Sequence, residues 1–71
     1  MNIFINGQTH DISNLTTKNL TEALGLFLSD DQKQRSYAVA LNGDFVGKTD
    51  YENTQVTAND SIDVLFPIQG G

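Results

Sequence analysis

Apolar and polar residues alternate at the start of the chain, which is the pattern of a β-strand with one buried face. Ile3 and Ile5 alternate with polar residues and with Phe4, and residues 9–12 are predicted to form a short returning strand after an interruption at Gly7-Gln8. Because successive side chains of a strand point to opposite faces, the two isoleucines face one way and Phe4 the other. These runs predict an N-terminal β-hairpin.

The next apolar segment has the spacing of a helix. Asn19, followed three positions later by Glu22, is typical of a helix N-cap. Gly25 within the segment costs about 1 kcal/mol relative to Ala, so we expect a short helix that depends on packing. The apolar stripe consists of Leu20, Ala23, Leu24 and Phe27.

A polar stretch separates this helix from the second half of the chain. Residues 29–36 contain no apolar side chain and are predicted to form a solvated connector. Residues 37–41 then alternate large and small side chains, which predicts a strand with Tyr37, Val39 and Leu41 facing the core.

An Asn-Gly pair at positions 42–43 predicts a tight hairpin turn, since type I′ turns need positive φ at both central residues. Residues 44–46 form the returning strand. Residues 47–57 are irregular, and Tyr51 and Val56 are the expected anchors of this segment in the core.

The last strand is predicted over residues 61–66, after a turn at residues 58–60. The order of hairpin, helix, hairpin, connector and strand predicts an α+β roll, a mixed sheet with one main helix packed on one face. The first and last strands should lie side by side in that sheet. Ile62, Val64 and Phe66 are expected on one side of the last strand, with Asp63 and Leu65 on the other.

The length of 71 residues allows one small domain with a thin core and little mass to enclose a deep catalytic pocket. We therefore do not expect an enzyme. His10 is the only histidine, and we expect it to be exposed. The serines lack the surroundings of a catalytic triad. The segment 43–49 resembles a phosphate-binding loop but has three residues between its glycines instead of four.

Charge and cysteine content exclude further classes of function. The net charge is −5, and residues 41–71 hold five acidic residues against Lys48 alone, so the chain lacks the basic surface that nucleic acids require. The longest apolar run is too short to cross a membrane. With no cysteine there is no disulfide or thiolate metal site. Together with the absence of a signal-peptide pattern, this predicts a cytoplasmic protein.

The C-terminus carries the one candidate for chemistry. Pro67 cannot continue a central ladder, so we expect a domain over residues 1–67 and a flexible tail over residues 68–71. Gly70 and Gly71 have no Cβ and could enter a narrow slot. A free carboxylate is a poor electrophile until an adenylating enzyme replaces its oxide with AMP as the leaving group, after which a sulfur or amine nucleophile can attack.

The segments Ala40–Val46 (ALNGDFV) and Asn59–Val64 (NDSIDV), with the final Gly-Gly, resemble the ThiS sulfur-carrier family of ubiquitin-like β-grasp proteins. The resemblance implies ATP-dependent adenylation of Gly71 by a ThiF-type enzyme, with Gly70 as its slender neighbour. It also implies conversion to a thiocarboxylate by a sulfur-donating enzyme and sulfur delivery to thiazole synthase for thiamine biosynthesis. ATP would be used by the partner, and no cofactor would be bound by the carrier itself. The related MoaD carriers of molybdopterin synthesis share the fold and the ending.

A docking surface is a second prediction. Phe4 and Leu65 point away from the side that the helix covers, and exposed apolar pairs on a small protein often mark a partner site. Phe66 and Ile68 would extend this surface toward the tail, and Asp63 could pair with a basic partner. Scattered apolar side chains are also normal on protein surfaces. There are three alternatives to a thiamine sulfur carrier: a MoaD-like sulfur carrier for molybdopterin synthesis, a ubiquitin-like modifier, and an interaction module whose Gly-Gly is incidental.

Overall fold

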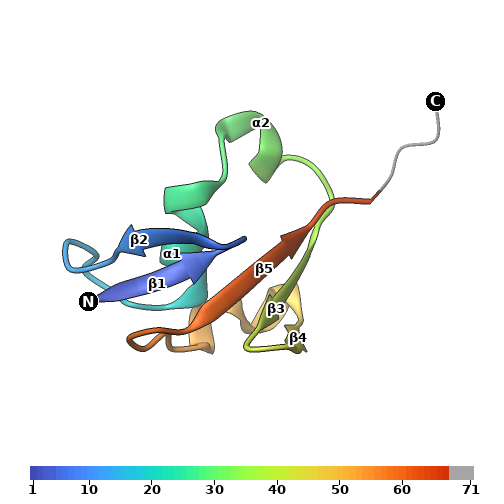
Figure 1. Ribbon diagram of the computed structural model, residues 1–71. Helices are drawn as coiled ribbons and strands as arrows, with labels where there is room; N and C mark the ends of the chain where they lie inside the picture. Colours follow the sequence, from blue (N-terminus) through green and yellow to red (C-terminus); the bar gives the residue numbers. More distant parts are fainter. Residues whose placement is uncertain (68–71) are drawn as a thin grey trace.

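A computed structural model describes residues 1–67 as a five-stranded mixed sheet with one main helix packed on one face (Figure 1). The predicted α+β roll is therefore observed. The elements are β1 (Asn2–Ile5), β2 (Gln8–Asp11), α1 (Leu20–Phe27), α2 (Asp30–Lys33), β3 (Ala38–Leu41), β4 (Asp44–Val46), the 3-10 helix η1 (Lys48–Asn53) and β5 (Ser61–Leu65).

The strands lie in the order β2-β1-β5-β3-β4, which makes β5 the central strand. Strands β1 and β5 are parallel neighbours, with Phe4 opposite Ser61, and the other three pairs are antiparallel. The predicted pairing of the first and last strands is confirmed. The C-terminal end of the roll thus leaves from the middle of the sheet (Figure 1).

Both hairpins turn on an Asn-Gly pair with positive φ at each residue. Asn42 and Gly43 have φ of 51° and 89°, as predicted for a type I′ turn, and Asn6 and Gly7 repeat the geometry at 50° and 80°. The first turn therefore lies one residue earlier than the interruption predicted at Gly7-Gln8, and β2 begins at Gln8.

The core lies between the sheet and α1, where strand alternation and the helical stripe meet. Ile3, Ile5 and Ile62 are fully buried, and burying each such side chain contributes about 1.5–3 kcal/mol. Tyr51 and Val56 are buried as predicted, so they anchor the irregular segment to the same core. Tyr37, Leu41, Phe27 and Phe66 are partly buried against it.

Helix α1 begins at the predicted N-cap. The Asn19 side-chain oxygen accepts a hydrogen bond from the Glu22 N–H at 2.9 Å, and its amide donates to the Glu52 carbonyl at 3.1 Å. The Leu20 N–H donates to the Thr54 carbonyl at 2.9 Å. Asn19 is itself buried, so one side chain caps the helix and ties α1 to the end of η1.

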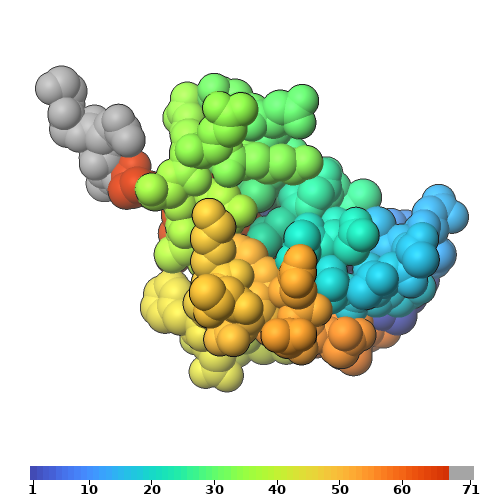
Figure 2. Space-filling model, turned by 180° about the vertical axis from the view of Figure 1, so that it is seen from behind, coloured from blue at the N-terminus to red at the C-terminus, as the bar shows by residue number. Residues whose placement is uncertain are grey.

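The two polar segments are more regular than the sequence predicts. The connector 29–36 contains α2, a single turn held by a capping box between Ser29 and Gln32. Residues 48–53 within the segment predicted to be irregular form η1. Among residues 1–67, no helix is both long and apolar enough to cross a membrane. Figure 2 views the molecule from behind Figure 1 and shows α1, α2 and η1 together on that side.

Candidate functional site

The candidate site begins where β5 ends. Leu65 is the last residue of the strand, and Phe66 and Pro67 complete the part of the chain that the structure describes. The predicted reacting residues Gly70 and Gly71, and Ile68 of the predicted docking surface, lie outside the described residues. The structure therefore defines the base from which the predicted tail begins.

Asn6 fixes this base from the neighbouring hairpin turn. Its side-chain oxygen accepts a hydrogen bond from the Val64 N–H at 2.7 Å, and its amide donates to the Val64 carbonyl at 3.2 Å. Strand β1 ends at Ile5, so no further residue of β1 pairs with Val64. The side-chain amide of Asn6 makes the two hydrogen bonds that a strand backbone would otherwise make. The end of β5 is thus held on both sides, since β3 pairs with it as far as Leu65. Sequence reasoning missed this role of Asn6.

Phe66 turns toward the core side of the sheet. Its ring meets the ring of Tyr37 edge-on, with 5.9 Å between the centroids. Leu65, Phe66 and Tyr37 also share a hollow of about 340 Å³ at this end of the sheet. Phe66 therefore follows Leu65 at the end of the central strand, on the core side, and does not lie beside Phe4.

The other face of the sheet exposes several large apolar side chains. The exposed fraction is 36% for Phe4, 52% for Leu65 and 73% for Phe45. In the strand register Ala40 lies opposite both Asp63 and Phe45. Because paired residues point to the same side of a sheet, these three share the exposed face with Leu65. We call Phe4, Phe45, Asp63 and Leu65 the sheet face.

The sheet face is spread along the strands. Phe4 pairs with Ser61 at the start of β5, whereas Leu65 is four positions further on, a separation of about 13 Å at 3.3 Å per residue. Phe45, the most exposed of the three large side chains, was not among the predicted docking residues. The alternation within β4 contains the signal for it, because Phe45 follows a tight turn and must point to the side opposite Val46.

Asp63 gives this face a negative charge, and β1, β3, β4 and β5 contain no Lys or Arg. Asp60 stands just before β5, where it accepts hydrogen bonds from the Thr57 N–H at 2.7 Å and from the Asn42 side chain at 3.0 Å. Burial raises the pKa of Asp60, but these hydrogen bonds outweigh it, and the net pKa lies below the ordinary value of 3.8. Asp60 is therefore ionised at neutral pH.

His10 is not exposed, contrary to the prediction. The register places it opposite Ile3 on the core side of β2, where its ring meets Phe27 edge-on at 6.3 Å between centroids. Its Nε2 atom is buried without a hydrogen-bond partner in the structure. Within residues 1–67, no three His, Asp or Glu side chains lie close enough together to hold a metal ion.

Comparisons with known proteins identify similar chains. A family model described as the ThiS family matches residues 3–71. A crystal structure of a thiamine biosynthesis protein (ThiS) from Geobacter metallireducens is 25% identical, with a TM-score of 0.76 over 100% of both chains. A solution structure of a thiamine biosynthesis protein from the same organism is 26% identical, with a TM-score of 0.68 over 100% of this chain and 88% of that one. No curated protein matches the sequence. These likenesses confirm the predicted β-grasp roll.

Proposed function

Because the chain belongs to the ThiS family, we propose that it is a sulfur carrier whose Gly71 carboxylate is converted to a thiocarboxylate for thiamine thiazole biosynthesis. The family match and the two solved thiamine biosynthesis proteins support a sulfur-carrier role in thiamine biosynthesis. One observation carries the proposal. The matched segment, residues 3–71, includes the Gly70-Gly71 ending as well as the roll.

The proposed chemistry takes place on the terminal acyl group. A carboxylate oxygen of Gly71 attacks the α-phosphorus of ATP, a P–O bond to pyrophosphate breaks, and an acyl adenylate forms. A hydrosulfide equivalent from a sulfur-donating enzyme then attacks the acyl carbon. The C–O bond to AMP breaks, AMP leaves with the former carboxylate oxygen, and the thiol proton passes to solvent. The carrier contributes the acyl group, and its partners contribute the catalytic residues.

The geometry of the roll supports this division of labour. The end of β5 is held by β3 and by the Asn6 side chain, so the roll presents its last described residues from a rigid base. Gly70 and Gly71 lack side chains, which suits entry into a narrow active site of a partner. We therefore propose that the roll is a handle for recognition and that the protein is not itself an enzyme.

Three partners follow from the proposal: a ThiF-type adenylating enzyme that uses ATP, a sulfur-donating enzyme, and a thiazole synthase that accepts the sulfur. We propose that the sheet face docks on the adenylating enzyme. Phe45 and Leu65 would supply apolar contact, and Asp63 would pair with a basic side chain of the partner. The absence of cations in these four strands favours a basic rather than an acidic partner at this face.

Intact-mass measurement tests the proposal directly. The full chain is incubated with a ThiF-type enzyme, ATP and a sulfur donor, and we expect one oxygen to be exchanged for sulfur. Deleting Gly71 should abolish the exchange, whereas the matched variant Gln69→Ala, which keeps Gly-Gly, should retain it. Circular dichroism checks that both variants keep the roll.

Three outcomes would contradict the proposal. Exchange in the Gly71-deleted chain would mean that another group reacts. High-molecular-weight conjugates in cell extract would instead indicate a ubiquitin-like modifier whose acyl group is passed to lysine. Transfer of sulfur by the charged protein to a molybdopterin synthase but not to a thiazole synthase would assign it to the MoaD-type pathway.

A further inference from the structure

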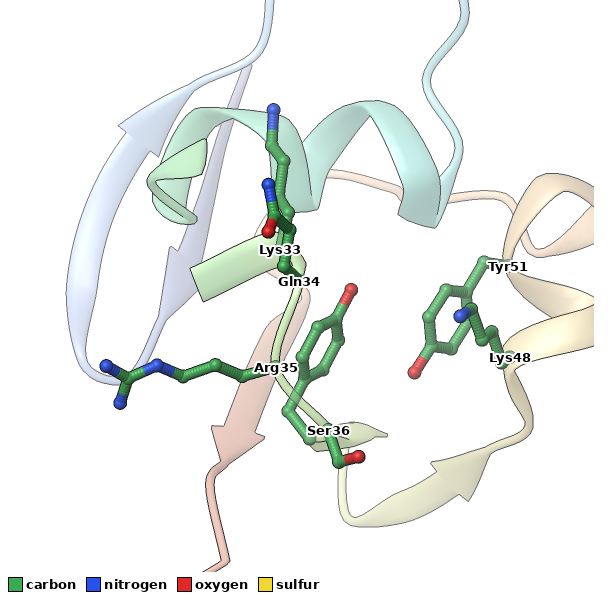
Figure 3. A pocket seen from close by; sticks show the side chains of 7 residues that line it. Lys33, Gln34, Arg35, Ser36, Lys48 and Tyr51 are labelled. Carbon is green, nitrogen blue, oxygen red and sulfur yellow. The ribbon is translucent and has the colours of Figure 1, made fainter. Parts of the chain in front are cut away.

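Most of the positive charge of this acidic protein gathers around one hollow on the helix side. Lys33 and Arg35 from the connector and Lys48 from η1 are three of the four basic residues in the chain. They line a hollow of about 240 Å³ together with Gln34, Ser36, Tyr37 and Tyr51. Figure 3 shows the labelled connector residues on one wall and Lys48 and Tyr51 on the other. The fold thus brings Lys33 and Lys48, which are distant in the sequence, to one hollow.

A second hollow of about 380 Å³ continues the first toward α1 and shares Lys33, Tyr37 and Tyr51 with it. Its other lining residues are mainly apolar, and they come from α1 and the residue that follows it. We call the two hollows together the basic groove. The residues added by the second hollow are Thr21, Glu22, Leu24, Gly25 and Leu28.

Gly25 is the residue in this groove that the fold does not explain. A Cβ built at Gly25 would meet no atom within 4 Å, so packing does not require glycine there. Glycine inside a helix costs about 1 kcal/mol relative to Ala. A bare helix surface at the floor of a groove does, however, leave room for another chain to approach closely. Gly25 therefore leaves the helix surface open at the apolar end of the groove.

Two of the three cations of the groove, Lys33 and Lys48, are available for an occupant. The structure records two ion pairs in residues 1–67, and neither includes Lys33 or Lys48. Arg35 is already paired with Asp31 at 3.1 Å, and it extends away from the hollow in Figure 3. Burial raises the pKa of Tyr51, with a smaller effect of Tyr37 in the same direction, so the Tyr51 hydroxyl stays protonated and can donate a hydrogen bond.

This chemistry fits carboxylates better than phosphates. Converging backbone N–H groups at a helix N-terminus and the fork of an arginine favour phosphate, and the one arginine of the chain, Arg35, is paired with Asp31. The groove offers instead two separate ammonium groups, with Lys33 shared by both hollows and Lys48 in the first, beside the mainly apolar lining of the second. Glu22 borders the apolar end, so the acidic part of an occupant would be directed toward Lys48.

We propose that the basic groove binds an acidic peptide segment of a partner protein, with a large apolar side chain against Gly25 and carboxylates facing Lys33 and Lys48. Recognition of acidic motifs by clustered cations beside an apolar pocket is a common mode of peptide binding. The groove lies on the helix side, and the sheet face lies on the opposite side of the sheet. A partner in the groove would therefore leave the sheet face accessible. Tyr37 lines the groove and also meets Phe66, so the groove adjoins the residues that follow β5.

The test uses the full ¹⁵N-labelled chain and a set of short synthetic peptides, each with one Leu or Phe flanked by Asp and Glu. We expect saturable amide shifts at Gly25, Tyr37, Lys48 and Tyr51, with none at Phe45 or Leu65. A matched peptide with Gln and Asn in place of the acids should bind at least about tenfold more weakly. Raising the salt concentration should also weaken the binding of the acidic peptide.

Three variants of the chain sharpen the test. The double reversal K33E/K48E should lower affinity at least about tenfold, whereas K18E, a single reversal at the lysine outside the groove, should change it less than about twofold. Gly25→Gln should fill the apolar end and weaken binding at least about threefold, yet raise the thermal midpoint because Gln is a better helix former. A merely structural role of Gly25 would not combine a more stable fold with weaker binding.

Several results would overturn the proposal. These are no saturable binding of any acidic peptide, equal binding of the neutral peptide, or shifts confined to the sheet face. Binding of AMP or inorganic phosphate at the groove without peptide binding would indicate a nucleotide or anion site. Dimers that dissociate in K33E/K48E would indicate a second copy of this chain. Peptide binding should persist when Gly71 is deleted, which separates this proposal from the sulfur chemistry.

Discussion

The sheet face and the basic groove lie on opposite sides of the same small roll and differ in almost every physical property. The sheet face is built from regular strands, exposes Phe45 and Leu65, and has Asp63 but no cation in the four strands that form it. The basic groove is built from short and irregular segments and holds Lys33 and Lys48. An acidic protein can therefore present a local cationic surface where two of its few cations line one groove.

The two surfaces also differ in what keeps them in place. Strand ladders on both sides hold the sheet face at β5. The groove depends on contacts between α1, the connector and η1, in which the buried Asn19 side chain is a principal link. We therefore expect variants of the sheet face to act on partner binding and variants near the groove to act first on local stability.

The largest effect is expected from removing the exposed apolar groups of the sheet face. In Phe45→Thr/Leu65→Thr the β-branched replacements suit a strand, so the thermal midpoint should change little. Loss of two apolar anchors should weaken binding to the adenylating enzyme by about 2–4 kcal/mol, measured by calorimetry. Leu26→Ala, an exposed apolar truncation on α1, is the control. Equal losses in both variants would refute a specific role of the sheet face.

A smaller effect is expected at the base of the predicted tail. Asn6→Gly keeps a residue that tolerates the positive φ but removes both hydrogen bonds to Val64. Leaving these part-buried backbone groups without partners should lower the free energy of unfolding by about 1–3 kcal/mol in urea titrations. Hydrogen exchange should accelerate at Val64 before it does in α1. Faster exchange in α1 alone would contradict this assignment.

Asn19→Ala should lower the free energy of unfolding by an amount comparable to or slightly smaller than that of Asn6→Gly. It removes the N-cap of α1 and the link to Glu52, and loss of such a cap typically costs about 1–2 kcal/mol. Urea unfolding measures the loss, and hydrogen exchange should rise in η1 while the β1–β5 ladder stays protected. Asn19→Asp, which can still accept the Glu22 N–H, should recover part of the stability.

The smallest effect is expected when the pH is lowered and the Asp60 carboxylate becomes protonated. The pKa of Asp60 is lower in the folded protein than its ordinary value of 3.8, so the folded state favours the ionised carboxylate. This contribution to stability is present above pH about 4 and is lost as the pH falls through the folded pKa. Asp60→Asn should therefore show a shallower decline of the thermal midpoint below pH about 4 than the unchanged chain. Identical declines would exclude a stabilising role for this charge.

Patterns within a few residues determined the elements of the fold. Alternation predicted β1, β3 and β5, the Asn-Gly pair predicted the second hairpin, and Asn19 predicted the start of α1. These are local properties, because side-chain direction in a strand and hydrogen bonding at a helix end depend on near neighbours. The resemblance of the last third of the chain and its Gly-Gly ending then predicted the family, which the match to residues 3–71 confirms.

Contacts between distant segments were decided by the tertiary structure alone. The register of β2 against β1 turned His10 toward the core, and pairing through Ala40 brought Phe45 and Asp63 into one row. The basic groove combines residues near positions 25, 33 and 48, which no local pattern connects. Local preferences set where each side chain points within its own element. Only the packing of those elements set which side chains meet, because that depends on the whole core at once.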